Sequence, residues 1–239
     1  MKPTIDALEG LLRRPGLDPG KRDWISRELR FVVAGSKTEH DAAYQIELHF
    51  GRSPHWATLH NLRFEVDGYA AQIDHLLINR LAEIWVCESK SFSEGAVINK
   101  HGEWQRSWQG ELTGMKSPVE QVNRQVLLLS RVFDDGAVGS PRRLGLLPRK
   151  PRIRGLVLVS DNAWIDRPDI DAPWLDEIIK VEHLRTRLYD AYDKASPIHL
   201  LGLIGKGSLA TMARQIAALH HPVDVDWPAR FGIAPSSMS

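Results

Sequence analysis

Three consecutive strand-like segments in the first half of this 239-residue chain constrain its fold more than any other feature. Apolar and polar residues alternate over 57–66, 70–79 and 83–92, and turn signals at Asp67-Gly68 and Asn79-Arg80-Leu81 separate the segments. Alternation with a period of two is typical of half-buried β-strands, and short turns between strands favour antiparallel pairing. The sequence therefore predicts an antiparallel meander.

Helical patterns flank this meander and predict a mixed α/β architecture. Ser36, three residues before Glu39, has the spacing of a capping box and predicts a helix that starts there. Ser117 followed by Pro118 predicts the start of a second helix, and the apolar run 155–160 predicts a buried strand. Further helices are expected around Leu8, Leu11 and Leu12, near 182–193 and near 208–220.

The net charge of +1, from 31 basic and 30 acidic residues, excludes strong attraction of nucleic acid over the whole surface. The charges separate into neighbouring segments, however: 141–154 holds six basic residues and no acid, whereas 161–182 holds seven acids against two bases. The basic segment is compatible with a local phosphate track and equally with a solvated loop. Its candidate nucleic-acid contacts are Arg142, Arg143, Arg149 and Lys150.

A single cysteine, Cys87, excludes an intramolecular disulfide and a cysteine-based zinc site. The first residues contain acids and no continuous apolar run, which is unlike a secretory signal. No stretch approaches the roughly 18–20 apolar residues that span a bilayer. We therefore expect a cytoplasmic protein without a membrane partner.

Charged residues on two neighbouring strands point to a chemical site. Glu88 and Lys90 share one strand face, and Asp74 lies on the strand before them. If the hairpin turns about Leu81, Asp74 and Glu88 are directly opposite, because each is seven residues from the turn centre. Paired carboxylates repel each other, so a divalent cation with oxygen ligands is expected to offset their charge. A structural ion-pair cluster on a half-exposed sheet is the alternative.

This arrangement of an Asp followed by Glu-x-Lys on the next strand resembles the PD-(D/E)XK nuclease superfamily, and more closely its NERD (nuclease-related) domain. Four landmarks carry the resemblance over about residues 35–133. They are Gly35-Ser36-Lys37-Thr38-Glu39, Gln72-Ile73-Asp74-His75, Glu88-Ser89-Lys90 and Ser117-Pro118-Val119-Glu120-Gln121. Ile73 stands where the superfamily name has Pro.

The resemblance implies a role for each landmark. Asp74, Glu88 and the backbone carbonyl of Ser89 would bind Mg²⁺ or Mn²⁺, and Lys90 would orient or deprotonate the attacking water. Glu39 would be a further ligand, directly or through water, and Gln121 would position a phosphate or the water. A structural role remains open for both residues: Glu39 fits a capping box, and Gln121 fits a solvated position in the first turn of a helix.

Other candidate residues have simpler explanations. His75 follows Asp74 and Cys87 precedes Glu88, so both side chains point to the other face of the sheet. We therefore expect His75 to be packed or hydrogen-bonded and Cys87 to be a buried thiol. Trp104 and Trp108 are candidates for stacking on bases or for core packing.

The resemblance implies a restriction-endonuclease-like α/β fold: a central mixed sheet that contains the meander, flanked by helices. We expect an N-terminal helical extension (1–34), a nuclease core (35–133), a stretch that completes the domain with a basic loop, a strand and an acidic, helical segment (134–205), and a C-terminal helix and tail (206–239). The expected function is Mg²⁺-dependent hydrolysis of phosphodiester bonds, with DNA rather than RNA as the partner.

Two other classes of protein remain open. One is a catalytically inactive nucleic-acid-binding module, and the other is a protein-interaction module on the same fold, docking a partner through its acidic segment. One metal ion is the minimum for the nuclease, and both a second ion and a homodimer stay open.

Overall fold

The computed structural model describes residues 2–143, 147–148, 150–193, 203–222 and 225–233. Contacts between residues divide the chain into two units, one formed by Met1–Thr38 with Pro222–Ser239 and the other by Glu39–His221. The segment 206–239, expected as one C-terminal part, therefore contributes to both units.

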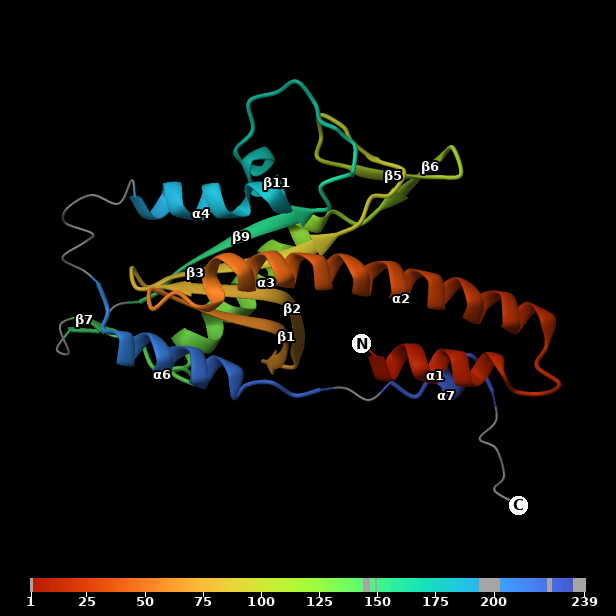
Figure 1. Ribbon diagram of the computed structural model, residues 1–239, viewed down its shortest axis with the longest axis horizontal. Helices are drawn as coiled ribbons and strands as arrows, with labels where there is room; N and C mark the ends of the chain where they lie inside the picture. The colour runs from red at the N-terminus through yellow and green to blue at the C-terminus, as the bar shows by residue number, and fades with distance from the viewer. Residues whose placement is uncertain (1, 144–146, 149, 194–202, 223–224, 234–239) are drawn as a thin grey trace, which may run out of the picture. The chain divides into compact units, whose positions relative to one another are not determined.

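The elements follow one another as a helical start, three long strands, short strands, a helix and a second set of strands and helices (Figure 1). The helices are α1 (Lys2–Leu12), α2 (Pro19–Ile46), η1 (Glu47–Gly51), α3 (Pro118–Asp134), η2 (Pro173–Glu177), η3 (Val181–His183), α4 (Leu184–Asp193), α6 (Lys206–Ala217) and α7 (Trp227–Arg230). The strands are β1 (Trp56–Val66), β2 (Tyr69–Asn79), β3 (Glu83–Lys90), β4 (Ala96–Ile98), β5 (Trp104–Trp108), β6 (Glu111–Met115), β7 (Arg142–Arg143), β8 (Leu147–Pro148), β9 (Arg152–Val159), β10 (Ile165–Asp166) and β11 (Ile178–Lys180).

A five-stranded mixed sheet forms the centre of the larger unit, with the order β1-β2-β3-β9-β11. The first three strands are antiparallel, whereas β9 and β11 run parallel to β3. The predicted meander and the predicted buried strand are both confirmed. Asp67 and Gly68 make the first turn with φ of 52° and 76°, the left-handed conformation that a tight two-residue hairpin requires.

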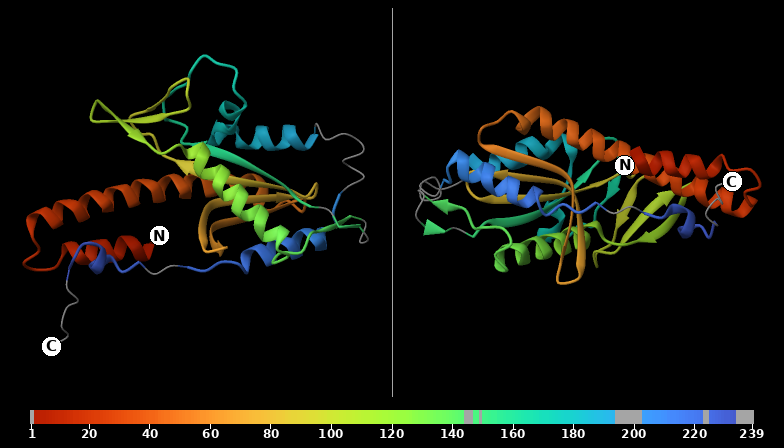
Figure 2. Two further views of the ribbon diagram at one scale, coloured as in Figure 1. Left: turned by 180° about the vertical axis from the view of Figure 1, so that it is seen from behind. Right: turned by 90° about the horizontal axis from the view of Figure 1, so that it is seen from below.

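Both faces of this sheet are buried, which explains the continuous apolar runs 76–78 in β2 and 84–87 in β3. Leu76 and Val86 pack toward α3, in one hydrophobic cluster with Val122 and Leu129. Every second residue of these strands, such as Trp85, points to the other face. These residues form a second hydrophobic cluster with residues from the end of α2 and from α4. Figure 2 shows α3 and α4 on opposite faces of the sheet.

A smaller sheet with the order β10-β4-β5-β6 follows the Glu-x-Lys strand in sequence. Its β5–β6 hairpin turns at Gln109 and Gly110, which have φ of 53° and 79°. Strands β4, β5 and β6 therefore form an antiparallel ribbon.

The predicted helix start at Ser36 is wrong. Helix α2 begins at Pro19 and continues through Ser36 to Ile46, so Ser36 and Glu39 are one turn apart inside a helix. Pro19 supplies the fixed backbone angle that suits the first helical position, and the glycine at position 35 does not interrupt the 28-residue helix. The spacing of a capping box is also the spacing of one helical turn, which is why the sequence alone misplaced the start.

In the smaller unit, Leu8, Leu11, Ile25, Trp227 and Phe231 form a separate hydrophobic cluster. The predicted helix around Leu8 is confirmed as α1. None of the described helices is long and apolar enough to cross a membrane.

Candidate functional site

The pairing of β2 with β3 places Asp74 level with Glu88. The register joins His75 to Cys87 and Leu76 to Val86, so the next pair along the hairpin is Asp74 and Glu88. This is the pairing that symmetry about Leu81 predicts. Both carboxylates are buried, with 8% of Asp74 and 4% of Glu88 exposed.

Hydrogen bonds connect the members of this cluster. The backbone N–H of Ser89 donates to Oδ2 of Asp74 at 2.8 Å, which ties β3 to β2 at the site. The Lys90 ammonium donates to Oε1 of Glu88 at 2.5 Å. The lysine side chain is 24% exposed, so it is the member of the pair that solvent reaches.

Glu39, on α2, completes an acidic group with Asp74 and Glu88. Burial and the negative charge of Glu88 raise the pKa of Glu39 to about 7. Burial, with the charges of Glu88 and Glu39, also raises the pKa of Asp74 well above its usual range. The structure therefore brings together Glu39, Asp74, Glu88, Ser89 and Lys90. The single ammonium group of the cluster cannot balance three carboxylates when all of them are ionised.

Gln125, which was not among the predicted site residues, contacts this cluster. Its amide nitrogen donates to Oε2 of Glu88 at 2.9 Å and to the Gln72 carbonyl at 2.6 Å. The backbone N–H of Gln121 donates to the Ser117 carbonyl in the first turn of α3, and the proposed role of its side chain stays a prediction.

The sequence contains a signal for Gln125. The buried face of α3 includes Val122, Leu129 and Val132, and Gln125 occupies the helical position between them. A polar residue within an apolar stripe requires a buried partner. Its carbonyl oxygen Oε1 has no partner among the described atoms although it is buried, which is consistent with an additional polar group or ion at the site.

A divalent cation would suit the chemistry of this cluster. Glu88 has each oxygen engaged by one donor, from Lys90 or Gln125, and a carboxylate oxygen can accept a second interaction. Oxygen ligands and excess negative charge match a hard cation such as Mg²⁺. Within the described ranges, no group of three or more His, Cys, Asp or Glu side chains is arranged to hold a metal ion. The expected set of Asp74, Glu88 and the Ser89 carbonyl stays a prediction.

A chain of hydrogen bonds supports β3 from the opposite face of the sheet. Nε2 of His75 lies 2.9 Å from Oγ of Ser89, and Nδ1 of His75 lies 2.8 Å from Nδ1 of His60. Nε2 of His60 lies 3.0 Å from Oε1 of Glu47, which also accepts a hydrogen bond from Thr58 at 2.5 Å. Burial lowers the pKa of His75 to about 3, so its ring is neutral. The expectation of a hydrogen-bonded His75 is confirmed.

Cys87 is fully buried, and burial raises the pKa of its thiol far above the usual range. The expectation of a buried, unreactive cysteine is therefore confirmed.

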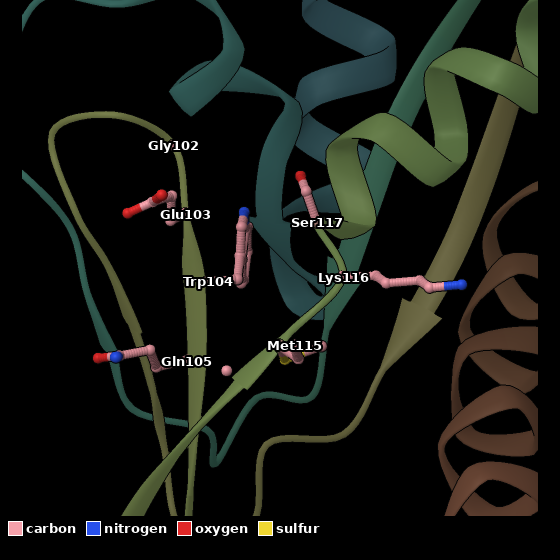
Figure 3. A pocket seen from close by; sticks show the side chains of 8 residues that line it. Gly102, Glu103, Trp104, Gln105, Met115, Lys116 and Ser117 are labelled. Atoms are coloured by element: carbon pink, nitrogen blue, oxygen red, sulfur yellow. The ribbon is translucent and has the colours of Figure 1, made fainter.

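A hollow lies next to the start of α3, where Ser117 accepts the N–H of Glu120 as the predicted cap. Residues of β5 and β6 line it together with Lys116 and Ser117 (Figure 3). Trp104 is only 2% exposed and stacks on Phe92 with ring centroids 5.8 Å apart, so core packing rather than base stacking explains it. The side chain of Trp108 lies outside the described part of the structure.

The candidate nucleic-acid contacts precede β9 in the sequence. Arg142 and Arg143 form β7, but their side chains and all of Arg149 lie outside the described residues. Lys150 is exposed and pairs with Asp134 at 2.5 Å. Strand β9 runs from Arg152 to Val159, parallel to Glu83–Lys90 of β3. Lys150 therefore lies near the start of these strands, whereas Lys90 lies at their end.

The mixed sheets with flanking helices define a nuclease-like α/β protein. The family model of the nuclease-related domain (NERD) matches residues 34–160, which is more than half of the chain. The chain therefore belongs to the NERD family, which is a family of the PD-(D/E)XK superfamily. No curated protein and no solved structure matches the chain.

Proposed function

We propose that this protein is a Mg²⁺- or Mn²⁺-dependent nuclease that hydrolyses phosphodiester bonds, with DNA as its expected substrate. The observation that carries the proposal is the acidic group of Glu39, Asp74 and Glu88 beside Lys90. Membership of a nuclease-related family supports the same chemistry. A cluster that served only stability would gain little from three carboxylates whose charges repel one another.

Asp74, Glu88 and the Ser89 carbonyl are the groups that would hold the metal ion, and Glu39 would reach it directly or through water. When bound, the ion supplies positive charge for the phosphate oxygens and lowers the pKa of a coordinated water. The unpartnered oxygen of Gln125 supports the presence of a further group at this place.

The side chains of the protein divide the remaining tasks. Lys90 would orient the attacking water, assist its deprotonation and stabilise negative charge on the phosphate. Gln125 keeps the Glu88 carboxylate in place through its hydrogen bond at 2.9 Å. Gln121 would position a phosphate or the water at the start of α3, where backbone N–H groups favour anions.

Cleavage of supercoiled plasmid tests the proposal. Wild-type protein with Mg²⁺ or Mn²⁺ should nick or linearise the plasmid, and EDTA should abolish cleavage. Lys90→Ala and Asp74→Ala should each lower the rate by about 10²–10⁴-fold, the usual range for a general-base or electrostatic group.

Lys100→Ala is the matched control for Lys90→Ala, because Lys100 is an exposed lysine in the turn between β4 and β5. Equal rates for wild type and Lys90→Ala, with no effect of EDTA, would reject the nuclease. Nucleic-acid binding that survives both active-site substitutions without any metal dependence would instead favour an inactive binding module. Parallel assays on RNA decide the class of nucleic acid.

A further inference from the structure

A second group of positive side chains surrounds a pocket of about 460 Å³ beside β11, the edge strand of the five-stranded sheet. The pocket is lined by Arg167, Leu175, Asp176, Ile178, Ile179, Lys180, His183 and Arg187. Two guanidinium groups and one ammonium group face a single carboxylate in this lining, so the pocket has an excess of positive charge. We call it the β11 pocket.

The β11 pocket lies at the same end of the central sheet as the acidic cluster. Val159 of β9 pairs with Lys90 on one side and with Lys180 on the other. Directly paired residues of neighbouring strands share a sheet face, so Lys90 and Lys180 project from the same face. Two strand spacings separate their backbones, which is about 10 Å. The carboxyl ends of parallel strands are also where α/β sheets usually bind ligands.

Backbone carbonyl groups hold two of these cations. Arg167 donates to the Ile178 carbonyl at 3.1 Å, and Lys180 donates to the Asp161 carbonyl at 2.5 Å. A neutral carbonyl fixes the direction of a cation without cancelling its charge, and each side chain retains further donors. Burial, together with the charge of Glu120, raises the pKa of the neighbouring Glu177, and the third cation, Arg187, opposes this rise.

We infer that the β11 pocket binds the phosphodiester backbone of the nucleic acid, on a phosphate that flanks the one held at Lys90. The inference rests on the proposed nuclease function. Arginine and lysine side chains at a fixed spacing are the usual contacts to backbone phosphates, and such contacts set the register of a strand without reading its sequence. The pocket would thus position the strand for cleavage next to Lys90.

The two basic regions of the protein predict different paths for the nucleic acid. Lys150 is separated from Lys90 by roughly the length of β9, which is about 26 Å for eight residues. Lys180 is at the level of Lys90, only two strands away. A short strand of nucleic acid bound at the acidic cluster therefore reaches the β11 pocket before it reaches Lys150.

Fluorescence anisotropy with a labelled DNA oligonucleotide tests this inference. All proteins carry Lys90→Ala and are measured with Mg²⁺, so that binding is followed on intact DNA, which a gel verifies. Adding Lys180→Ala and Arg187→Ala should weaken binding on the order of 10-fold at low salt. The slope of log K against log salt should fall in magnitude by about 1.5, the change expected for two lost phosphate contacts.

Lys100→Ala with Arg131→Ala is the matched control, since it removes one lysine and one arginine from other exposed positions. Arg187→Lys should restore most of the affinity, because a point charge can still contact a phosphate. Circular dichroism and thermal unfolding verify that each variant is folded, and Lys180→Gln with Arg187→Gln replaces any variant that is not.

Three results would overturn the inference: absence of DNA binding by the parent protein, unchanged affinity in the pocket variant, or an equal loss in the control. Loss of affinity in Lys150→Ala alone would place the contact near the start of β9, at the opposite end of the strands. The proposed function is judged separately by plasmid cleavage with Lys90 intact. A pocket that binds DNA in a protein that does not cleave would support the binding site and reject the nuclease.

Discussion

At the scale of single residues, the hydrogen-bond chain behind β3 has a definite direction. A carboxylate only accepts, so Nε2 of His60 must donate to Glu47, and Nδ1 of a neutral His60 must then accept. Nδ1 of His75 therefore carries the proton between the two rings, and its Nε2 accepts from the Ser89 hydroxyl. The chain holds Ser89 on one face of the sheet while Asp74 binds its backbone N–H.

We expect His75 to be the Nδ1–H tautomer and His60 the Nε2–H tautomer. Long-range ¹H–¹⁵N NMR spectra of the two imidazole rings distinguish these forms. Glu47→Leu should remove the preference at His60. A His75 ring protonated on Nε2 would contradict the assigned direction.

The same chain predicts an effect on metal binding. Ser89→Ala removes the last hydroxyl and should weaken Mn²⁺ affinity by about 10-fold, the lower end of the usual loss when a group that orients a metal ligand is removed. Isothermal titration with Mn²⁺ measures this directly. Ser107→Ala, a change of the same kind in β5, should leave the affinity unchanged.

At the scale of the elements, the approach of α3 to β9 determines where Gln125 and Gln121 lie. Gly155 of β9 permits this approach, because an added Cβ would lie 2.1 Å from Cγ1 of Val122. The helix lies across β2, β3 and β9, and its buried face covers the strand face that carries Asp74 and Glu88. Close packing here is therefore a condition for the Gln125 contact with Glu88.

Gly155→Ala should destabilise the protein by about 1–3 kcal/mol, the usual cost of forcing an extra carbon into a packed interior. Chemical denaturation measures the change in the free energy of unfolding. Gly114→Ala is the matched control, since a Cβ in strand β6 meets no atom within 4 Å. A neutral Gly155→Ala would show that α3 shifts easily, and the Gln125 contact would then not depend on tight packing.

At the scale of the whole molecule, the buried carboxyl groups couple stability to pH and to metal. Glu39 and Asp74 have a higher pKa in the folded protein than in the unfolded chain, because burial and neighbouring carboxylates disfavour their charged forms. The folded state therefore binds more protons between the two pKa values. Their contribution to stability is present below about pH 4 and is lost as the pH rises through the folded values.

Without metal, Tm should fall between pH 5 and pH 8.5, and this fall should be smaller in the variant that carries Glu39→Gln and Asp74→Asn. Mg²⁺ should raise Tm of the wild type most at the upper end of this range, because it replaces the lost protons. About 2–4 °C of Tm corresponds to 1 kcal/mol for a chain of this size, so calorimetry resolves the effect. Equal pH profiles for both proteins would contradict this coupling.

The sequence alone determined the meander, the face shared by Glu88 and Lys90, and the pairing of Glu88 with Asp74. These features depend on the two-residue period of strands and on turn symmetry, which are local properties. The start of α2 was predicted wrongly, because the spacing of Ser36 and Glu39 is identical in a cap and inside a helix.

Only the tertiary structure decided which distant residues join the site. Gln125 reaches Glu88 because α3 packs on β9, and Lys180 comes level with Lys90 because β11 pairs with β9. Contacts of this kind depend on the packing angle of elements far apart in sequence, and no local period of the chain contains that information.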